Sequence, residues 1–400
     1  MYNAGNRGPK VKSDCYVEFI PKESGGIDVQ LKSKVEVYYG KSIRTLIESM
    51  LNYYNIEHAQ LIVEDTGALP FILMARLEAV LRKATNSNKE YLPEILTENL
   101  NSTDKNRFRF SRLYLPGNSP KMMLNAGLHN PCGLILDLED AVAFDKKYEA
   151  RFVVRNALRA LNFYGAERMV RINQGEMGLE DLEFLVPHNV NLILVPKCEK
   201  KEDLQKVNNK IDSLKTKYNI DYPIWLMPII ESAKGVIHAH EIALQDNVVA
   251  LAIGLEDYTA DLGTRRTNEA TESFYARCQL VNAAKAAGVQ PIDSVFSDVA
   301  DMEGLKQNVL KSKSLGFVGM GCIHPRQIKV IKDNFAPDIA EIEKAKKIYL
   351  AFVEATKKGL GVVSLGTKMI DPPVVKRAET TINLAIETGK LNSNWAQEYE

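Results

Sequence analysis

From residue 107 onward, short apolar runs alternate with stretches that place apolar residues every three or four positions. The runs have the length of buried strands and the stretches have the periodicity of amphipathic helices. Strands that alternate with helices pair in parallel, and eight such strands close a (β/α)8 barrel, the TIM-barrel α/β fold. The expected strands are 113–115, 133–137, 168–172, 192–195, 224–228, 249–253, 291–295 and 316–320, with helices such as 145–161 and 275–287 between them.

A doubly wound open sheet uses the same alternation and is the alternative fold. No Gly-x-Gly-x-x-Gly sequence follows the first expected strand, which counts against it. The barrel also demands that polar functional groups gather where strands end. The second to eighth expected strands meet this demand with Asp137-Leu-Glu-Asp140, Arg171-Ile-Asn173, Pro196-Lys197, Glu231, Asp257, Asp293 and Ile323-His-Pro325.

The residues on either side of the barrel divide into three further segments. Residues 1–84 predict a small α+β unit, with strands at 16–20, 27–31 and 59–65 and helices at 42–54 and 72–83. Residues 85–106 are rich in Asn and Ser and predict a polar linker, with a short helix at 92–100. The barrel is expected over 107–335. A helical extension is expected over 336–400, its helices 339–358 and 374–388 separated by the glycine-rich stretch 359–366.

Composition narrows the class of protein. Hydrophobic residues make up 45% and charged residues 26%, values typical of a globular domain. The 51 basic and 51 acidic residues balance, so neither nucleic acid nor a membrane is expected as a partner. The polar start predicts no signal peptide, and five unpatterned cysteines indicate a reducing compartment. We therefore expect a cytoplasmic protein.

Two carboxylates, Glu231 and Asp257, follow the fifth and sixth expected strands. A buried parallel strand has no use for a carboxylate except at its end, where a loop opens to water. Two carboxylates from neighbouring strand ends, completed by waters and a ligand, suit Mg²⁺. The alternative is that one or both cap the helix that follows.

Ordered motifs across residues 107–390 resemble the citrate lyase β-subunit (HpcH/HpaI aldolase/citrate lyase) family. They are Leu115-Pro-Gly, Ile135-Leu-Asp-Leu-Glu-Asp-Ala-Val142, Val170-Arg-Ile-Asn173, Val195-Pro-Lys197, Ile230-Glu-Ser-Ala233, Ile253-Gly-Leu-Glu-Asp-Tyr258, Asp261-Leu-Gly263, Ile323-His-Pro-Arg-Gln-Ile328 and Met369-Ile-Asp371. The resemblance implies a homotrimeric TIM barrel whose extension contacts a neighbouring subunit as a lid. It also implies Mg²⁺-dependent retro-aldol cleavage of a 3-hydroxyacyl thioester (citryl, citramalyl or malyl) to an acetyl thioester and a 2-oxo acid.

The chemistry then suggests roles for individual residues. Mg²⁺ held by Glu231 and Asp257 would chelate the substrate hydroxyl and carboxylate. Arg171 would bind the substrate carboxylate or the developing negative oxygen; its alternative is a pair with Asp137 or Glu139. We expect Glu139 and Asp140 to orient metal-bound waters. Lys197 either neutralises a substrate carboxylate or forms a structural ion pair.

Asp371 precedes two prolines, which is typical of a helix cap. In the family, an aspartate of the C-terminal extension of a neighbouring subunit reaches into the barrel as acid/base, and Asp371 matches that position. His324 precedes Pro325 and is expected to be structural.

The first 84 residues resemble the acyl carrier (γ) subunit of citrate lyase, through Gly26-Ile-Asp-Val-Gln-Leu-Lys-Ser, Gly40-Lys-Ser-Ile-Arg, Val63-Glu-Asp-Thr-Gly-Ala-Leu69 and Ala75-Arg-Leu-Glu-Ala79. That subunit carries a phosphoribosyl-dephospho-CoA arm on a serine two residues before an aspartate. Here Lys12 takes that place and Ser13 is its neighbour.

Three alternatives stay open. The arm is attached at Ser13 and the chain acts with an acyl-transferase (α) subunit. Or the chain is a lyase that acts on free CoA thioesters and its carrier domain is vestigial. Or it is a non-catalytic carrier or scaffold component.

Overall fold

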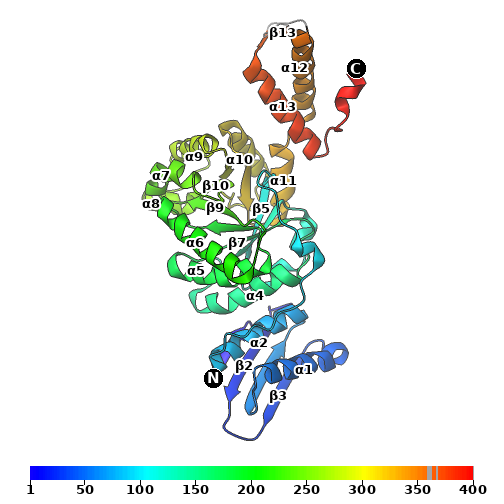
Figure 1. The fold of residues 1–400 in the computed structure, drawn as a ribbon, viewed down its shortest axis with the longest axis vertical. Helices are drawn as coiled ribbons and strands as arrows, with labels where there is room; N and C mark the ends of the chain where they lie inside the picture. Colours follow the sequence, from blue (N-terminus) through cyan, green and yellow to red (C-terminus); the bar gives the residue numbers. More distant parts are fainter. Residues whose placement is uncertain (358–362, 366–367, 400) are drawn as a thin grey trace.

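A computed structural model describes residues 1–357, 363–365 and 368–399 (Figure 1). A closed barrel of eight parallel strands occupies the middle of the chain, as the periodicity predicts. A small α+β domain packs at one side of the barrel, and a helical hairpin extends from the other end of the molecule. Each barrel strand pairs with the next in the sequence, and the last pairs with the first.

The barrel strands coincide with the predicted ones to within a few residues. They are β5 (Ser111–Pro116), β6 (Gly133–Asp137), β7 (Glu167–Arg171), β8 (Leu192–Val195), β9 (Trp225–Ile230), β10 (Ala250–Ile253), β11 (Gln290–Asp293) and β12 (Gly319–Cys322). The last strand starts three residues later than expected. Gly316, with φ of 102°, ends the preceding helix in the left-handed conformation that glycine tolerates, so the strand cannot begin there.

Helices surround the strands and leave the barrel interior to apolar side chains such as Ile135, Met169, Met227 and Ile229. The outer helices are α3 (Pro120–Met123), α4 (Lys147–Ala160), α5 (Gly175–Glu183), α6 (Lys201–Tyr218), α7 (Ala233–Ala243), α8 (Leu255–Asp261), α9 (Phe274–Ala286), α10 (Met302–Leu315) and α11 (Pro325–Phe335). None of the helices within the described residues is long and apolar enough to cross a membrane.

The N-terminal domain is a four-stranded sheet in the order β1-β2-β4-β3 with two helices. Its elements are β1 (Tyr2–Gly5), β2 (Cys15–Pro21), β3 (Ile27–Ser33), α1 (Glu36–Tyr53), β4 (Ala59–Asp65) and α2 (Pro70–Thr85). The pattern did not predict β1, because a four-residue edge strand with polar residues has no visible alternation. The first turn of α1 was also missed, because Val37 and Tyr38 are exposed rather than facing the core.

Helix α2 lies between the N-terminal sheet and α4 of the barrel, and buried ion pairs join the two domains (Figure 1). Arg76 on α2 pairs with Asp14 at 3.0 Å and with Glu149 of α4 at 3.2 Å. Glu78 on α2 pairs with Arg155 of α4 at 2.6 Å. Because an unpaired buried charge is costly, these pairs hold the N-terminal domain against the barrel in one arrangement.

The polar segment 85–106 is fastened to the barrel, although its composition suggests a loose linker. Its 3₁₀ helix covers Thr97–Leu100, a shorter helix than the predicted 92–100. Asn99 is buried and donates to the carbonyls of Leu158 and Leu161 beyond the middle of α4. The carbonyl of Thr103 accepts from Trp225 at the start of β9. These hydrogen bonds therefore fix the segment to the end of the barrel where the strands begin.

The C-terminal extension is a hairpin of α12 (Ile339–Lys357), β13 (Val363–Leu365), β14 (Lys368–Ile370) and α13 (Pro372–Glu387). It stands away from its own barrel, with β13 at the far end (Figure 1). Its helices pack on each other around Ala345, Ala378, Ile382 and Trp395. Most of the predicted glycine-rich stretch 359–366 lies outside the described residues, apart from β13.

Candidate functional site

Glu231 and Asp257 meet at the mouth of the barrel, where the strands end. Glu231 directly follows β9, and Asp257 lies one turn into α8, which follows β10. The backbone amide of Lys197 donates to Oε2 of Glu231 at 3.2 Å, and Nζ of Lys197 lies 3.5 Å from Oδ1 of Asp257. One lysine therefore contacts both expected metal ligands. Neither carboxylate is the cap of its following helix: Ser232 caps α7, and α8 begins after Gly254.

Lys197 reaches this position through an unusual backbone. Its φ of 49° lies in the left-handed region, which costs a non-glycine residue on the order of 1–3 kcal/mol. The same conformation leaves Nζ 3.6 Å from Oε1 of Glu139 and 3.9 Å from Oδ2 of Asp140. The expected structural ion pair of Lys197 is therefore present, and it is made to several carboxylates of the mouth.

Arg171 ends β7 and makes both of the pairs expected as alternatives to substrate binding. Its Nε and Nη2 donate to the two carboxylate oxygens of Asp137, at 2.8 and 2.6 Å. Its Nη1 lies 2.9 Å from Oε2 of Glu139, and its guanidinium lies 5.3 Å from the ring centre of Tyr114. The hydrogen bond and charge of Asp137 outweigh burial and raise the pKa of Arg171, so it stays charged.

The mouth holds more negative charge than its cations balance. Burial, followed by the charges of Glu139 and Asp257, raises the pKa of Glu231 to about 8. Burial also raises the pKa of Glu139. Arg171 is largely engaged by Asp137, which leaves Lys197 to be shared by the remaining carboxylates. A divalent cation would lower this excess charge.

The donor set fits Mg²⁺. Glu231 and Asp257 supply hard oxygen ligands, and Mg²⁺ completes its shell with waters and substrate oxygens. Gly254 leaves the space that the carboxylate of Glu231 occupies, because a Cβ there would lie 2.5 Å from Oε1. No group of three or more His, Cys, Asp or Glu within the described residues is arranged to hold a metal. A metal at this mouth would therefore rely on Glu231 and Asp257 together with waters and substrate oxygens.

A cavity of about 250 Å³ extends from this mouth into the barrel. Its lining includes Glu231 and Asp257 at the top and Arg112, Ile229 and Gly321 deeper in. Arg112, a buried cation on β5, was not predicted, because it lies within a strand and the candidate residues were sought at strand ends. The signal was present: Arg112 and Tyr114 are alternate residues of one strand and therefore share its inward face.

Two further residues that shape the mouth were also missed. Lys147, on the first turn of α4, donates to the carbonyls of Leu138 and Glu139 and to Oδ1 of Asn173. Gln174 donates to Oε1 of Glu139 at 2.7 Å. These contacts fix the loop that carries Glu139.

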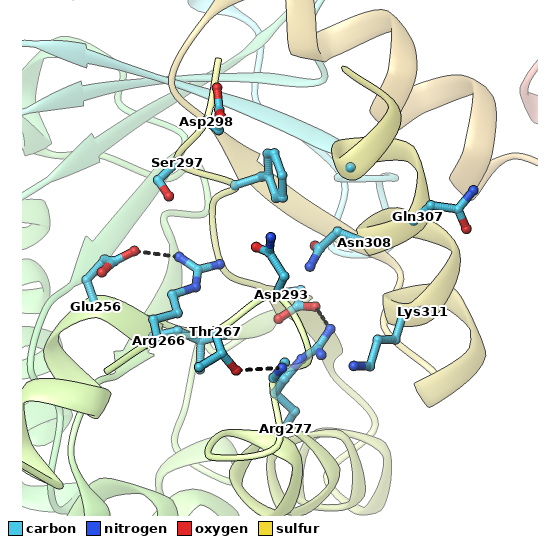
Figure 2. A pocket seen from close by; sticks show the side chains of 15 residues that line it. Glu256, Arg266, Thr267, Arg277, Asp293, Ser297, Asp298, Gln307, Asn308 and Lys311 are labelled. Atoms are coloured by element: carbon cyan, nitrogen blue, oxygen red, sulfur yellow. Dashed lines mark hydrogen bonds and ion pairs between the residues drawn. The ribbon is translucent and has the colours of Figure 1, made fainter. Parts of the chain in front are cut away.

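Asp293, noted among the strand-end groups, borders the mouth cavity, but its carboxylate is held by residues of the surrounding helices. Its carboxylate pairs with the buried Arg277 and accepts from Ser312. These contacts border a second cavity of about 350 Å³, which Figure 2 shows between the residues after α8 and helix α10. There Arg266 pairs with Glu256 at 2.8 Å, and Lys311 and Asn308 extend from α10. These contacts therefore fix the end of β11, of which Asp293 is the last residue.

The remaining candidates lie away from the metal pair. Ser13 is half-buried with φ of 56°, and Lys12 is exposed. The neighbouring Asp14 binds Arg76, which also donates to the carbonyl of Asn118 just after β5. Ser13 thus lies near the mouth side of the barrel.

Two of the residues considered above cap helices: His324, expected to be structural, and Asp371, for which a cap was the alternative to an acid/base role. Nδ1 of His324 accepts from Arg326 and caps α11. Asp371 caps α13 by accepting from the amide of Val374, in the hairpin that stands away from its own barrel.

Comparison with known proteins places this site in context. Residues 111–325 match the HpcH/HpaI aldolase/citrate lyase model, and residues 7–84 match the malonate decarboxylase delta subunit model. Citrate lyase subunit beta of Haemophilus influenzae is 36% identical over 283 residues, which cover 70% of this chain and 97% of that protein. Human mitochondrial citramalyl-CoA lyase is 33% identical over 286 residues, which cover 68% and 84%.

A similar solved structure is protein CitE from Mycobacterium tuberculosis in complex with magnesium, acetoacetate and coenzyme A. It is 28% identical with a TM-score of 0.59, and the match covers 70% of this chain and 98% of that one. The family model spans more than half of the chain, and the barrel fold is the same. The chain belongs to the HpcH/HpaI aldolase/citrate lyase family.

Proposed function

We propose that this protein is a Mg²⁺-dependent carbon–carbon lyase. Its substrate class is a 3-hydroxyacyl thioester, of the citryl, citramalyl or malyl type, which it cleaves to an acetyl thioester and a 2-oxo acid. The observation that carries the proposal is the convergence of Glu231, Asp257 and Lys197 at a mouth with excess negative charge. The β-subunit and citramalyl-CoA lyase relatives support the reaction class.

Each residue of the mouth has a role in this reaction. Glu231 and Asp257 would hold the metal, which would supply Lewis-acid chemistry to the substrate when bound. Glu139 and Asp140 orient waters around it. Arg171, held by Asp137, presents fixed positive charge where the substrate carboxylate or a developing oxyanion lies. Lys197 neutralises the substrate carboxylate when substrate separates it from its acidic neighbours.

Asp371 is proposed as the acid/base, supplied by a neighbouring subunit of a homotrimer. It accepts the proton of the 3-hydroxyl group as the carbon–carbon bond breaks and returns a proton to the acetyl thioester enolate. The support is that its own hairpin stands away from its own barrel, so Asp371 is not near the mouth of the chain that carries it. In this role the extension 336–400 is both a subunit contact and a lid.

The N-terminal domain is proposed as a carrier-like module with Ser13 as its attachment residue. Ser13 lies beside the loop after β5, so an acyl arm there would start on the mouth side of the barrel. An acyl-transferase (α) subunit would then load the arm. In the alternative, free CoA thioesters enter the mouth directly and the domain serves only as structure.

The test is production of a 2-oxo acid from citryl-, citramalyl- and malyl-CoA with and without Mg²⁺. We expect activity that EDTA removes and Mg²⁺ restores. Glu231→Ala and Asp257→Ala should each abolish activity while circular dichroism stays unchanged. Intact mass of protein from its native host then distinguishes the carrier alternatives, since an arm adds a fixed mass that Ser13→Ala removes and Lys12→Ala retains. Full activity of both metal-site variants in chelator would refute the metal site.

A further inference from the structure

Arg112 is a charged residue in the interior of the barrel. It lies on β5 and its exposure is 1%. Its Nη1 contacts the sulfur of Met227 at 2.9 Å, and its Nε has no hydrogen-bond partner. No carboxylate among the described residues forms an ion pair with it. The other deeply buried arginines at domain and strand contacts, such as Arg109 and Arg155, each have a glutamate partner.

A buried guanidinium without an acidic partner is an unusual arrangement. Arginine stays protonated in proteins, and taking its charge out of water costs several kcal/mol that a thioether sulfur does not offset. Burial lowers the pKa of Arg112, and no acidic residue is among the groups that raise it. The surroundings, including Met227 and Ile229, are apolar. The position is therefore one where an anion would be strongly favoured.

The cavity of the mouth connects Arg112 to the metal pair. Its lining runs from Glu231 and Asp257 down to Arg112, with Ala252 and Gly321 providing space between. A Cβ on Gly321 would lie 2.7 Å from Val295 and 3.1 Å from Tyr114, so only a residue without a side chain fits there. A substrate whose hydroxyl and one carboxylate lie at the metal pair can thus extend a further group toward Arg112.

We propose that Arg112 binds a second carboxylate on the 2-oxo-acid half of the substrate, so that the 2-oxo acid released is a dicarboxylate. This inference rests on the proposed lyase function. Among the three thioester types, the citryl type carries such a carboxylate. The citramalyl type has a methyl group there and the malyl type a hydrogen, and both leave the guanidinium unpaired.

The test compares wild type, Arg112→Met and Arg112→Lys on citryl-, citramalyl- and malyl-CoA with Mg²⁺. Methionine has a similar length and suits the apolar interior, so Arg112→Met should fold with unchanged or higher thermal stability. We expect wild type to prefer citryl-CoA. Losing a charged hydrogen bond should lower kcat/KM for citryl-CoA by about ten- to a hundredfold in Arg112→Met. Citramalyl-CoA activity should hold or rise, and Arg112→Lys should restore part of the preference.

A binding measurement separates this inference from the proposed reaction. Oxaloacetate and pyruvate are titrated calorimetrically into the full-length protein in Mg²⁺. Wild type should bind oxaloacetate more tightly than pyruvate, and Arg112→Met should lose that difference, even if no thioester is cleaved. Equal losses for all three thioesters, or an oxaloacetate preference that persists in Arg112→Met, would overturn the role of Arg112. Absence of cleavage with the binding preference intact would instead count against the lyase function alone.

Discussion

Gly254 lies directly against the carboxylate of Glu231, so that a Cβ on Gly254 would stand 2.5 Å from Oε1 and 2.6 Å from Cγ of that glutamate. The residue before α8 therefore limits where the carboxylate of Glu231, the proposed metal ligand after β9, can lie. A methyl group there must displace Glu231, because the contact is far below van der Waals distance.

The first prediction follows from this contact. Gly254→Ala should raise the Mg²⁺ concentration needed for half-maximal activity by about tenfold or more, because the added methyl group displaces the carboxylate of Glu231. A tenfold loss of affinity corresponds to about 1.4 kcal/mol of binding free energy. Activity titrated against Mg²⁺ measures it. Gly263→Ala is a matched control, since Gly263 has open space around its Cβ position, although its φ of 70° adds modest strain. Unchanged Mg²⁺ dependence in Gly254→Ala would place Glu231 outside the metal site.

The second prediction concerns Asp371 and the subunit boundary. Asp371→Asn should lower turnover by about 10²–10⁴-fold, the usual contribution of a proton-transfer group, with little change in Mg²⁺ affinity. Mixing inactive Asp371→Asn with inactive Glu231→Ala under subunit exchange should restore activity. Some mixed assemblies then hold an intact metal pair facing an intact Asp371. If labelled subunits exchange and no activity returns, each barrel does not depend on its neighbour's Asp371.

The third prediction concerns stability against pH through His188. Burial lowers the pKa of His188 below its ordinary value, so the unfolded chain takes up a proton at higher pH than the folded chain. Its stability contribution is present above the unfolded pKa of about 6.5 and is lost as pH falls below it. Glu231 acts in the opposite direction over this range, because its raised pKa stabilises the folded protein as pH falls. Urea unfolding at pH 8 and pH 5.5 therefore measures the contribution of His188 as a difference between the wild type and a variant without it.

A variant isolates this effect. His188→Gln should gain stability at pH 5.5 relative to pH 8 when it is compared with the wild type. Glu90, whose Oε1 lies 3.8 Å from Nε2 of His188, does not interfere: burial raises its pKa, but the interactions with His188 and Arg155 outweigh burial and hold the pKa at about 2. Its contribution is lost only as pH falls below about 4.5 toward that value. An identical pH dependence in wild type and His188→Gln would show that folding does not lower the pKa of His188.

The fourth prediction concerns the contact between the two domains. Arg76→Met removes the shared cation of Asp14 and Glu149, which leaves the buried Asp14 without an ion-pair partner and Glu149 with Lys146 alone, and should cost about 3–5 kcal/mol. Limited proteolysis should then cut within 85–106, a segment that is held on the barrel in the wild type. Lys329→Met is the control, because its ion pair with Asp333 is exposed and worth little. Equal resistance of both variants to protease would mean that apolar packing alone holds the domain.

The barrel, which the structure confirms, and the position of Glu231 and Asp257 at its mouth were predicted for the same physical reason. Buried parallel strands appear in the sequence as continuous runs of apolar residues, and a carboxylate that ends such a run marks the end of the strand, as at Glu231. Asp257 follows the same rule, although it lies one turn into a helix. Arg171 was predicted with its alternative partners, and the structure shows that it contacts both Asp137 and Glu139.

The remaining features depend on three-dimensional contacts that no local pattern records. Arg112 sits within a strand rather than at its end, so the rule that found Glu231 passes over it. Asp293 satisfies that rule, but its carboxylate is held by Arg277 from α9. Residues 85–106 have the polar composition of a linker, yet the side-chain amide of Asn99 donates hydrogen bonds to carbonyls at the end of α4 and holds the segment there.

The buried ion pairs of Arg76 also bear on the effective concentration of a thioester attached to the N-terminal domain. They hold Ser13 beside the loop after β5, so a thioester attached there could not diffuse away from its own barrel. Tethered groups on short links experience effective concentrations on the order of millimolar. A loaded chain would therefore work near saturation at any protein dilution that preserves its assembly. Free CoA thioesters would compete with the tethered one only when they approach the same concentration.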